Sequence, residues 1–150
     1  MQILTFVLNN IEFGISVSDV SSIETTMNIT PVPAAPDHVK GIVWLHEKLI
    51  PIYSLVSKFG YPDQKILNTV VIEADGVNLG LEVGEVKEIL ELPDKQIIPM
   101  PLIMKGTQNF FNDVASSNKK LIVLLTVENL LNEAEREELK RVIEENKNDD

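Results

Sequence analysis

The sequence predicts a mainly β fold that contains many short strands. Glycine and proline interrupt short apolar runs at regular spacing, which is typical of small β-barrels and sandwiches. The order of these runs occurs twice along the chain, and only the C-terminal segment has the periodicity of a helix. Apolar residues make up 44% of the 150 residues, which is enough to form a substantial core.

The first predicted element is a β-hairpin. Residues 3–8 are an apolar strand, two asparagines supply the turn, and residues 12–17 are the return strand. Gly14, inside the return strand, indicates a bulge or a tight barrel corner. Three aliphatic residues then recur at every third position, which predicts one or two tight helical turns facing inward: Val17, Val20 and Ile23.

A proline-rich segment, residues 29–36, is predicted to be a surface loop or a sheet edge. Its three prolines fix φ and remove amide donors, so neither a helix nor a central strand fits. Two apolar runs follow within residues 39–55 and predict a hairpin with the polar pair His46–Glu47 at its tip. Residues 57–64 are polar, contain glycine and proline, and are interpreted as a connector.

The second half repeats the order of the first. The pattern of residues 12–23 recurs in residues 78–89, with these equivalent pairs: Gly14 and Gly80, Val17 and Val83, Val20 and Val86, Ile23 and Ile89. The run Lys48–Ile50 recurs as Lys120–Ile122. Each half has about 60 residues, too few to bury much surface alone, so we expect the halves to share a core or an interface.

The last segment predicts one helix from about residue 133 to 146. Asn132 followed by Glu135 is a plausible capping pair. Five apolar residues fall near one helical face: Leu131, Ala134, Leu139, Val142 and Ile143. We expect this helix to be structural, because its apolar stripe is short and its exposed side is strongly acidic. The final residues, 146–150, are predicted to be disordered.

Composition and motifs argue against catalysis. The chain has no cysteine, which excludes disulfides, thiolate metal sites and cysteine nucleophiles. The two histidines, His38 and His46, lack the partners of a metal site and are interpreted as polar loop and hairpin-tip residues. No nucleophile elbow, P-loop or dinucleotide fingerprint occurs. We therefore expect no enzymatic activity, no cofactor and no metal.

Charge and hydropathy narrow the class of partner. The net charge of −10 opposes binding to nucleic acid, and aromatic residues are only 5% of the chain, so few side chains can stack on bases or sugars. No apolar stretch reaches the roughly 18 residues that span a bilayer, and the N-terminus lacks a secretion signal. These features favour a cytoplasmic module that binds other proteins or small cations.

Three stretches resemble, in order and spacing, the CheW family of chemotaxis coupling proteins: "IEFGISVSDVSSIE", "ITPVPAAPDHVKGIVWL" and "KLIPIYSLVSKFG". In the second half, "GLEVGEVKEIL", the "PMP" loop and "KKLIVLLTVENLL" stand where that family repeats its unit. The resemblance covers about residues 3–131. It implies one CheW-like domain, residues 1–150, of two five-stranded SH3-like β-barrels that share a core. Its subdomains are expected at approximately 1–60 and 67–131, with short helices and a C-terminal helix at approximately 132–146.

The resemblance also implies a non-enzymatic adaptor. Family members bridge the cytoplasmic tips of chemoreceptors and the regulatory domain of the histidine kinase CheA, in arrays at the inner face of the membrane. The expected partners are therefore that kinase domain and the receptor tip, without nucleic acid and without direct membrane insertion. An alternative is a divergent CheW-like regulatory or scaffold module of another sensory two-component system.

Carrying family positions onto this sequence gives five candidate partner-binding residues: Val20, Ile23, Gly41, Trp44 and His46. Val20 and Ile23 match positions associated with the receptor-facing groove between the barrels, although a core role is an alternative. Gly41 matches a glycine whose loss perturbs coupling in the family, although a backbone requirement is an alternative. Trp44 shares a strand face with Ile42 and is expected to be an exposed anchor, or else to cap the barrel end.

The hairpin tip departs from the family pattern. Residues 44–47 are Trp-Leu-His-Glu where the family usually has Asn-Leu-Arg-Gly, and Ser22 stands where a glutamate is common. Both charges of a possible ion pair are thus lost together, which leaves neither one unpaired. We expect Ser22 and His46 to lie close enough for a neutral hydrogen bond. These departures place the standard set of partners in question.

Overall fold

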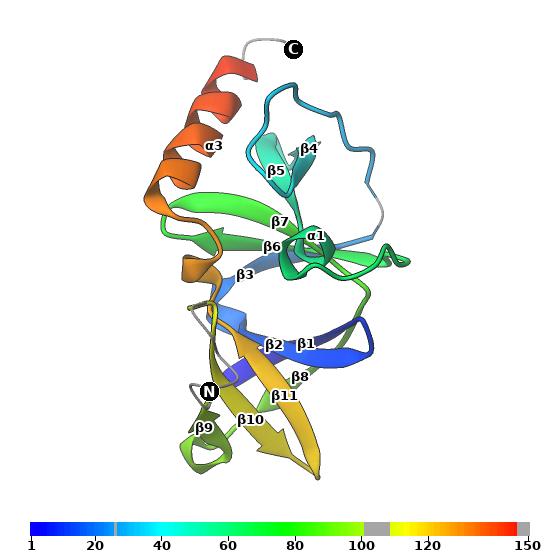
Figure 1. Ribbon diagram of the computed structural model, residues 1–150, viewed down its shortest axis with the longest axis vertical. Helices are drawn as coiled ribbons and strands as arrows, with labels where there is room; N and C mark the ends of the chain where they lie inside the picture. Colours follow the sequence, from blue (N-terminus) through cyan, green and yellow to red (C-terminus); the bar gives the residue numbers. More distant parts are fainter. Residues whose placement is uncertain (26, 101–108, 147–150) are drawn as a thin grey trace.

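The computed structural model describes residues 1–25, 27–100 and 109–146, and the described strands form two sheets in two tiers (Figure 1). The lower tier in Figure 1 is a six-stranded sheet and the upper tier a five-stranded sheet. Pro101 of the "PMP" loop and the tail after Asn146 lie outside the described residues.

The six-stranded sheet has the strand order β8-β1-β2-β11-β10-β9. Its strands are β1 (Gln2–Leu8), β2 (Ile11–Ser16), β8 (Glu85–Glu91), β9 (Ile97–Pro99), β10 (Phe111–Ser117) and β11 (Lys120–Leu125). Neighbouring strands are antiparallel, except that β2 and β11 are parallel.

The five-stranded sheet has the strand order β3-β6-β7-β5-β4. Its strands are β3 (Val20–Glu24), β4 (Val39–Leu45), β5 (Lys48–Ser54), β6 (Asn68–Ala74) and β7 (Val77–Val83). Here β5 and β7 are the parallel pair. The predicted fold class, mainly β with two SH3-like barrels, is confirmed, and β9 is an additional strand on one barrel.

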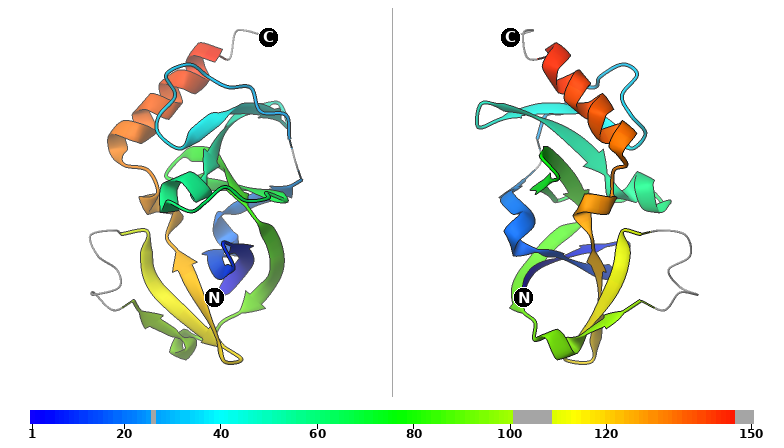
Figure 2. Two further views of the ribbon diagram at one scale, coloured as in Figure 1. Left: turned by 45° about the vertical axis from the view of Figure 1, so that its right-hand side comes forward. Right: turned by 90° about the vertical axis from the view of Figure 1, so that its left-hand side faces the viewer.

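Each sheet contains strands from both halves of the sequence repeat. In the six-stranded sheet, β1 and β2 pair with β8 and β11, while in the five-stranded sheet β6 and β7 pair with β3 and β5. This arrangement arises because the chain crosses to the other sheet after the β1–β2 hairpin, at β3, and crosses back after the β6–β7 hairpin, at β8, as the colours in Figure 2 allow the reader to follow. The halves 1–60 and 67–131 therefore do not form one sheet each.

The largest buried cluster contains side chains from both sheets. Phe6 and Phe13 come from the six-stranded sheet, and Tyr53, Ile72 and Leu81 come from the five-stranded sheet. Two smaller clusters lie one in each barrel, around Ile3 and Ile122 in the first and around Ile50 and Ile52 in the second. The expectation that the two halves share a core is confirmed.

The equivalent glycines Gly14 and Gly80 allow close packing between strands. A Cβ atom on Gly14 would lie 2.8 Å from Cδ1 of Ile3, and one on Gly80 would lie 2.7 Å from Cδ1 of Ile52. The pairing of β1 with β2 passes Gly14 without a register shift. Of the two alternatives predicted at Gly14, a bulge or a tight barrel corner, the bulge is therefore absent, and the small space beside Ile3 is a reason for glycine there.

Short helices join the strands. Of the helical turns predicted over Val17, Val20 and Ile23, only a single 3₁₀ turn exists, η1 (Val17–Asp19); Val20 and Ile23 instead lie in strand β3. Further 3₁₀ turns are η2 (Asp94–Gln96) and η3 (Val127–Asn129). Residues 57–59, predicted to belong to a connector, instead lie in helix α1 (Leu55–Phe59). The Ser57 amide donates to Ser54 Oγ at its start, and Gly60 at φ 71° ends it.

Helix α3 (Glu133–Asn146) lies beside the five-stranded sheet and begins with the predicted capping pair (Figure 1). The Asn132 amide donates to Oε1 of Glu135 at 3.0 Å, and the Glu135 amide donates to Oδ1 of Asn132 at 2.7 Å. Leu139 and Val142 are buried beneath the helix. Ala134, predicted on the same face, is exposed.

Candidate partner-binding surface

Val20 and Ile23 lie on the crossover strand β3, at the edge of the five-stranded sheet. A register shift at Ser21 places Val20 opposite Ile72 and Ile23 opposite Val70, so both side chains face the side of the shared core. Val20 packs against that core, whereas Ile23 is 44% exposed. The alternative of a core role therefore holds for Val20 but not for Ile23.

The other crossover strand, β8, repeats this arrangement. Val86 lies opposite Phe6 and packs against the shared core, while Ile89 lies opposite Leu4 and is 57% exposed. A register shift again separates the two pairs. Val86 and Ile89 were not among the site residues expected from the sequence. The internal repeat, which aligns them with Val20 and Ile23, was the signal that could have identified them.

Gly41 has a backbone requirement. Its φ is 157°, and a Cβ atom there would lie 2.2 Å from the carbonyl oxygen of Thr30. That close approach permits two backbone hydrogen bonds of 2.9 Å between Thr30 and Ile42. Gly41 thereby holds the start of the proline-rich segment against β4, which identifies a structural reason for glycine at this position.

Trp44 lies near the end of β4 and is half exposed, while Ile42 on the same strand is buried. It borders two grooves. The first, of about 680 Å³, lies between β4 and the segment after β3. The second, of about 600 Å³, lies between the β4–β5 hairpin and residues such as Ile143 of α3. The Trp44 side chain is therefore accessible to solvent, and it also lies near helix α3.

His46 and Glu47 form the turn at the tip of the β4–β5 hairpin, as predicted. Both have left-handed backbones, with φ of 50° and 64°. Nε2 of His46 lies 4.0 Å from Oε2 of Glu24, at the end of β3. The polar neighbour of His46 in the structure is therefore Glu24, and not Ser22 as expected.

The first groove places one candidate residue, Trp44, opposite Glu24, which was not predicted as a site residue. Glu24 and Trp44 both line the first groove, so the end of β3 faces the end of β4 across it. Val20 and Ile23 do not line that groove. The candidates consequently divide into an apolar surface on the crossover strands and a second surface around the β4–β5 hairpin.

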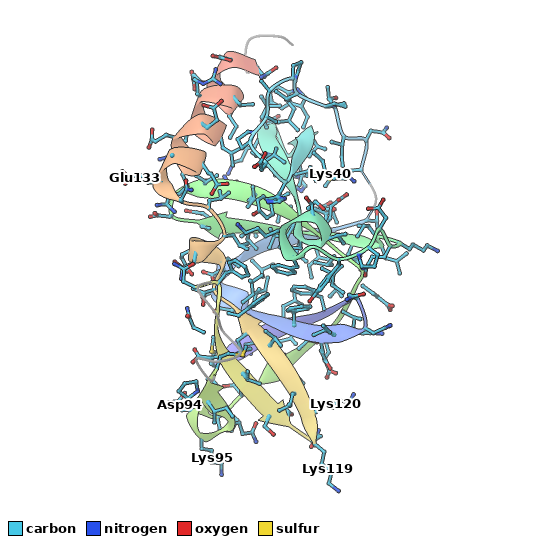
Figure 3. The ribbon with its side chains drawn as sticks, in the orientation of Figure 1. Lys40, Asp94, Lys95, Lys119, Lys120 and Glu133 are labelled. Carbon is cyan, nitrogen blue, oxygen red and sulfur yellow. The ribbon has the colours of Figure 1, made fainter. Side chains whose placement is uncertain are left out.

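Three ionisable side chains near these surfaces or in the shared core have environments that the structure explains. The carboxylate of Glu82 is nearly buried in β7 and pairs with Nζ of Lys40 at 3.0 Å; Figure 3 shows Lys40 in the upper tier. Burial, together with the nearby charge of Glu128, raises the pKa of Asp19 above its ordinary value. Burial also raises the pKa of Tyr53, whose hydroxyl donates to the Leu130 carbonyl. Hence Tyr53 stays protonated in the shared core.

Two further features are absent from the described residues. No group of three or more histidine, aspartate or glutamate side chains is arranged to hold a metal ion. No described helix is long and apolar enough to cross a membrane.

Comparison with known proteins gives consistent matches over most of the chain. The family model of the CheW-like domain matches residues 2–135. The chemotaxis protein CheW of Klebsiella aerogenes is 28% identical over 138 residues, which cover 89% of this chain and 83% of that protein. The chemotaxis protein CheW of Helicobacter pylori is 24% identical over 134 residues, covering 87% and 81% respectively.

A solved structure has the same fold. The crystal structure of the scaffolding protein TtCheW from Thermoanaerobacter tengcongensis superimposes with a TM-score of 0.81 at 25% identity. The match covers 89% of this chain and 94% of the other. The similarity therefore includes both barrels.

Proposed function

This chain belongs to the family of CheW-like domains, and from that membership we propose that it is a non-catalytic adaptor that couples chemoreceptor tips to the histidine kinase CheA. The observation that carries the proposal is the match of the family model to residues 2–135, which contain both barrels. The names of similar proteins, which describe chemotaxis and scaffolding, support the same function. The adaptor would act in the cytoplasm, at receptor arrays on the inner face of the membrane.

An adaptor needs at least two surfaces, and the described residues offer two separate ones. Ile23 and Ile89 give the crossover strands exposed apolar side chains, which suit the apolar face of a helical receptor tip. Trp44 offers an aromatic anchor at the other surface, where we place a second contact. The chain would act as one unit, because the two barrels share their largest core.

Co-sedimentation with receptor-containing membranes and CheA tests the proposal. We expect the wild-type chain to sediment with membranes and to increase the amount of kinase that sediments. Ile23→Asp and Ile89→Asp should each reduce sedimentation of the chain, because they place a charge in the proposed apolar contact. Ile11→Asp is the matched control, since Ile11 is also exposed but lies at the β1–β2 turn.

The outcomes separate the alternatives. Equal loss in all three variants would indicate a general effect on folding and would count against a crossover contact. No sedimentation of the wild-type chain with either partner would contradict the adaptor function.

The second candidate function, a module of another sensory two-component system, is favoured by one observation. The hairpin tip carries Trp44, His46 and Glu47 where the family usually has asparagine, arginine and glycine. If this surface selects a different kinase, Trp44→Ala should weaken binding to that kinase while leaving the weak or absent binding to CheA unchanged. Pull-down of purified sensor kinases with the wild-type and Trp44→Ala chains distinguishes the two functions.

A further inference from the structure

The outer edge of β4 carries backbone groups that are free to pair with another strand. Ile42 uses its amide and carbonyl to bond Thr30, so these groups point away from β5. Backbone groups two residues apart on a strand point to the same side, so the amide and carbonyl of Trp44 share this direction. Among the described residues, Trp44 has no hydrogen bond at this edge. At this edge the backbone groups of Ile42 are already paired with Thr30, whereas those of Trp44 are available to a further strand.

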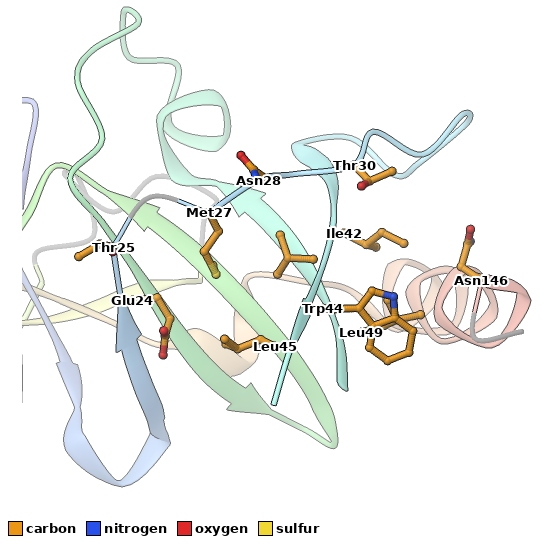
Figure 4. Close-up of a pocket in the computed structure, with 11 residues that line it drawn as sticks. Glu24, Thr25, Met27, Asn28, Thr30, Ile42, Trp44, Leu45, Leu49 and Asn146 are labelled. Atoms are coloured by element: carbon orange, nitrogen blue, oxygen red, sulfur yellow. The ribbon is translucent and has the colours of Figure 1, made fainter. Parts of the chain in front are cut away.

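The open part of the edge borders the first groove. Figure 4 shows the segment with Met27 and Asn28 on one side of β4, and the Trp44 indole directed to the other side, toward α3. The groove has a volume of about 680 Å³, and the half-exposed indole stands at its margin. An extended chain in this groove could form backbone hydrogen bonds with Trp44 and place alternate side chains against the indole.

Charge restricts what the groove can bind. Glu24 is the charged residue among the described residues that line it, and Asn146 at the C-terminal end of α3 lines the opposite side (Figure 4). The described lining of the groove therefore carries a net negative charge from Glu24, within a chain of net charge −10.

We propose that this groove is a docking site for an extended, basic segment of a partner protein, which adds as a strand to the β4 edge at Trp44. The amide and carbonyl of Trp44 pair with the backbone of the segment, and Glu24 pairs with one of its lysine or arginine side chains. A second copy of this chain is disfavoured as the occupant, because two acidic chains repel each other. The inference does not depend on the adaptor function.

The single tryptophan of the chain is Trp44 itself, so its fluorescence reports directly on the groove. The probe is the acetylated and amidated peptide Lys-Val-Lys-Val-Lys-Val-Lys, titrated at about pH 8. We expect a saturable change in Trp44 fluorescence with Kd below about 1 mM. The glutamate analogue of the peptide should give no change. A lysine–valine peptide with alternate amides N-methylated should also give none, because it has lost its strand donors.

Two variants test the charge argument. Glu24→Gln should weaken binding of the lysine–valine peptide by about fivefold, whereas Glu73→Gln, which removes the same charge from an exposed position on β6, should change binding less than twofold. Amide exchange measured by NMR should show slower exchange of the Trp44 amide in the bound state. Slower exchange there is a result that side-chain binding alone would not produce.

Four results would overturn the proposal. The first is the absence of any saturable change with the lysine–valine peptide up to about 2 mM. The second is equal binding of the acidic peptide, and the third is undiminished binding of the N-methylated peptide. The fourth is a change in Trp44 fluorescence on raising the protein concentration alone, with dimers in sedimentation, which would assign the edge to a second copy of the chain.

Discussion

At the scale of single residues, the hairpin turn at His46–Glu47 carries a local conformational strain. Both residues have positive φ, a conformation that costs a non-glycine residue roughly 1 kcal/mol. The same turn type connects β10 and β11, where Lys119 has a φ of 65°. Figure 3 shows Lys119 at the lower end of the molecule, and its hairpin belongs to the other sheet from the β4–β5 hairpin. The two equivalent turns thus allow a matched test.

We expect Glu47→Gly to raise the free energy of unfolding by up to about 1 kcal/mol, because glycine adopts this turn conformation without the steric penalty. Lys119→Gly in the equivalent turn should have a similar effect. Urea denaturation of both variants measures it. A decrease in stability for Glu47→Gly alone would mean that the Glu47 side chain makes a stabilising contact.

The Asp19 carboxyl gives a pH-dependent expectation. Its folded-state pKa is raised above the ordinary value of 3.8 by burial and by Glu128, so the folded protein holds this proton more tightly than the unfolded chain. The protonated Asp19 carboxyl therefore favours the folded state, and this contribution to the free energy of unfolding is lost as the pH rises through the pKa of Asp19 in the folded protein. Asp19→Asn should increase the unfolding free energy at pH 7 by less than about 1 kcal/mol, and the gain should vanish below pH about 3.

Thermal denaturation of Asp19→Asn and of Glu73→Gln, across pH 3 to 8, checks this sign. Glu73→Gln removes an equal charge from an exposed position on β6 and serves as the control. The assignment fails if both variants gain the same stability at pH 7, since the gain would then reflect net charge alone.

At the scale of elements, the proline-rich segment is attached to β4 through the close approach at Gly41. Gly41→Ala should lower the unfolding free energy by about 2 kcal/mol or more, because its Cβ would meet the Thr30 carbonyl oxygen at 2.2 Å. Gly60→Ala is the control, since Gly60 also has positive φ but has open space around its Cβ position. A loss in Gly41→Ala no larger than in Gly60→Ala would show that the segment moves aside easily.

Helix α3 is expected to be structural. Truncation after Leu131 should lower the unfolding free energy by about 2 kcal/mol or more, since it removes the buried side chains of Leu139 and Val142. It also removes Arg136, which pairs with Asp75 at 3.3 Å and donates to the Leu131 carbonyl. Denaturation and binding of a hydrophobic dye measure the result. Unchanged stability with lost partner binding would reassign α3 to a partner site.

At the scale of the whole molecule, the crossings of the chain between the two sheets at β3 and β8 make the barrels interdependent. Neither half of the sequence contains all strands of one sheet, so neither should fold alone. We expect fragments 1–61 and 62–150 to be unfolded separately and to recover the native circular dichroism spectrum when mixed. A stably folded single fragment would contradict the interdependence of the two barrels.

Much of the fold could be predicted from the sequence because strand signals are local. The alternation of apolar residues, the asparagine and glycine turns, and the pairing of Asn132 with Glu135 each act within a few residues, and they located the hairpins and α3. Helix α1 was missed because it is little more than one turn long. Its N-cap residue, Ser54, is also the last residue of β5, which the sequence assigned to the hairpin of residues 39–55. The sequence repeat was the basis for predicting that the two halves share a core.

The sequence by itself determined the repeat, the β class, the terminal helix and the family resemblance, because each depends on residue order. Only the tertiary structure decided that the chain crosses between the sheets at β3 and β8, that His46 lies near Glu24, and that Trp44 lies between the β4–β5 hairpin and α3. The physical reason is that these contacts join residues distant along the chain. Their geometry depends on how two sheets curve around a common core, and no local pattern of residues encodes that curvature.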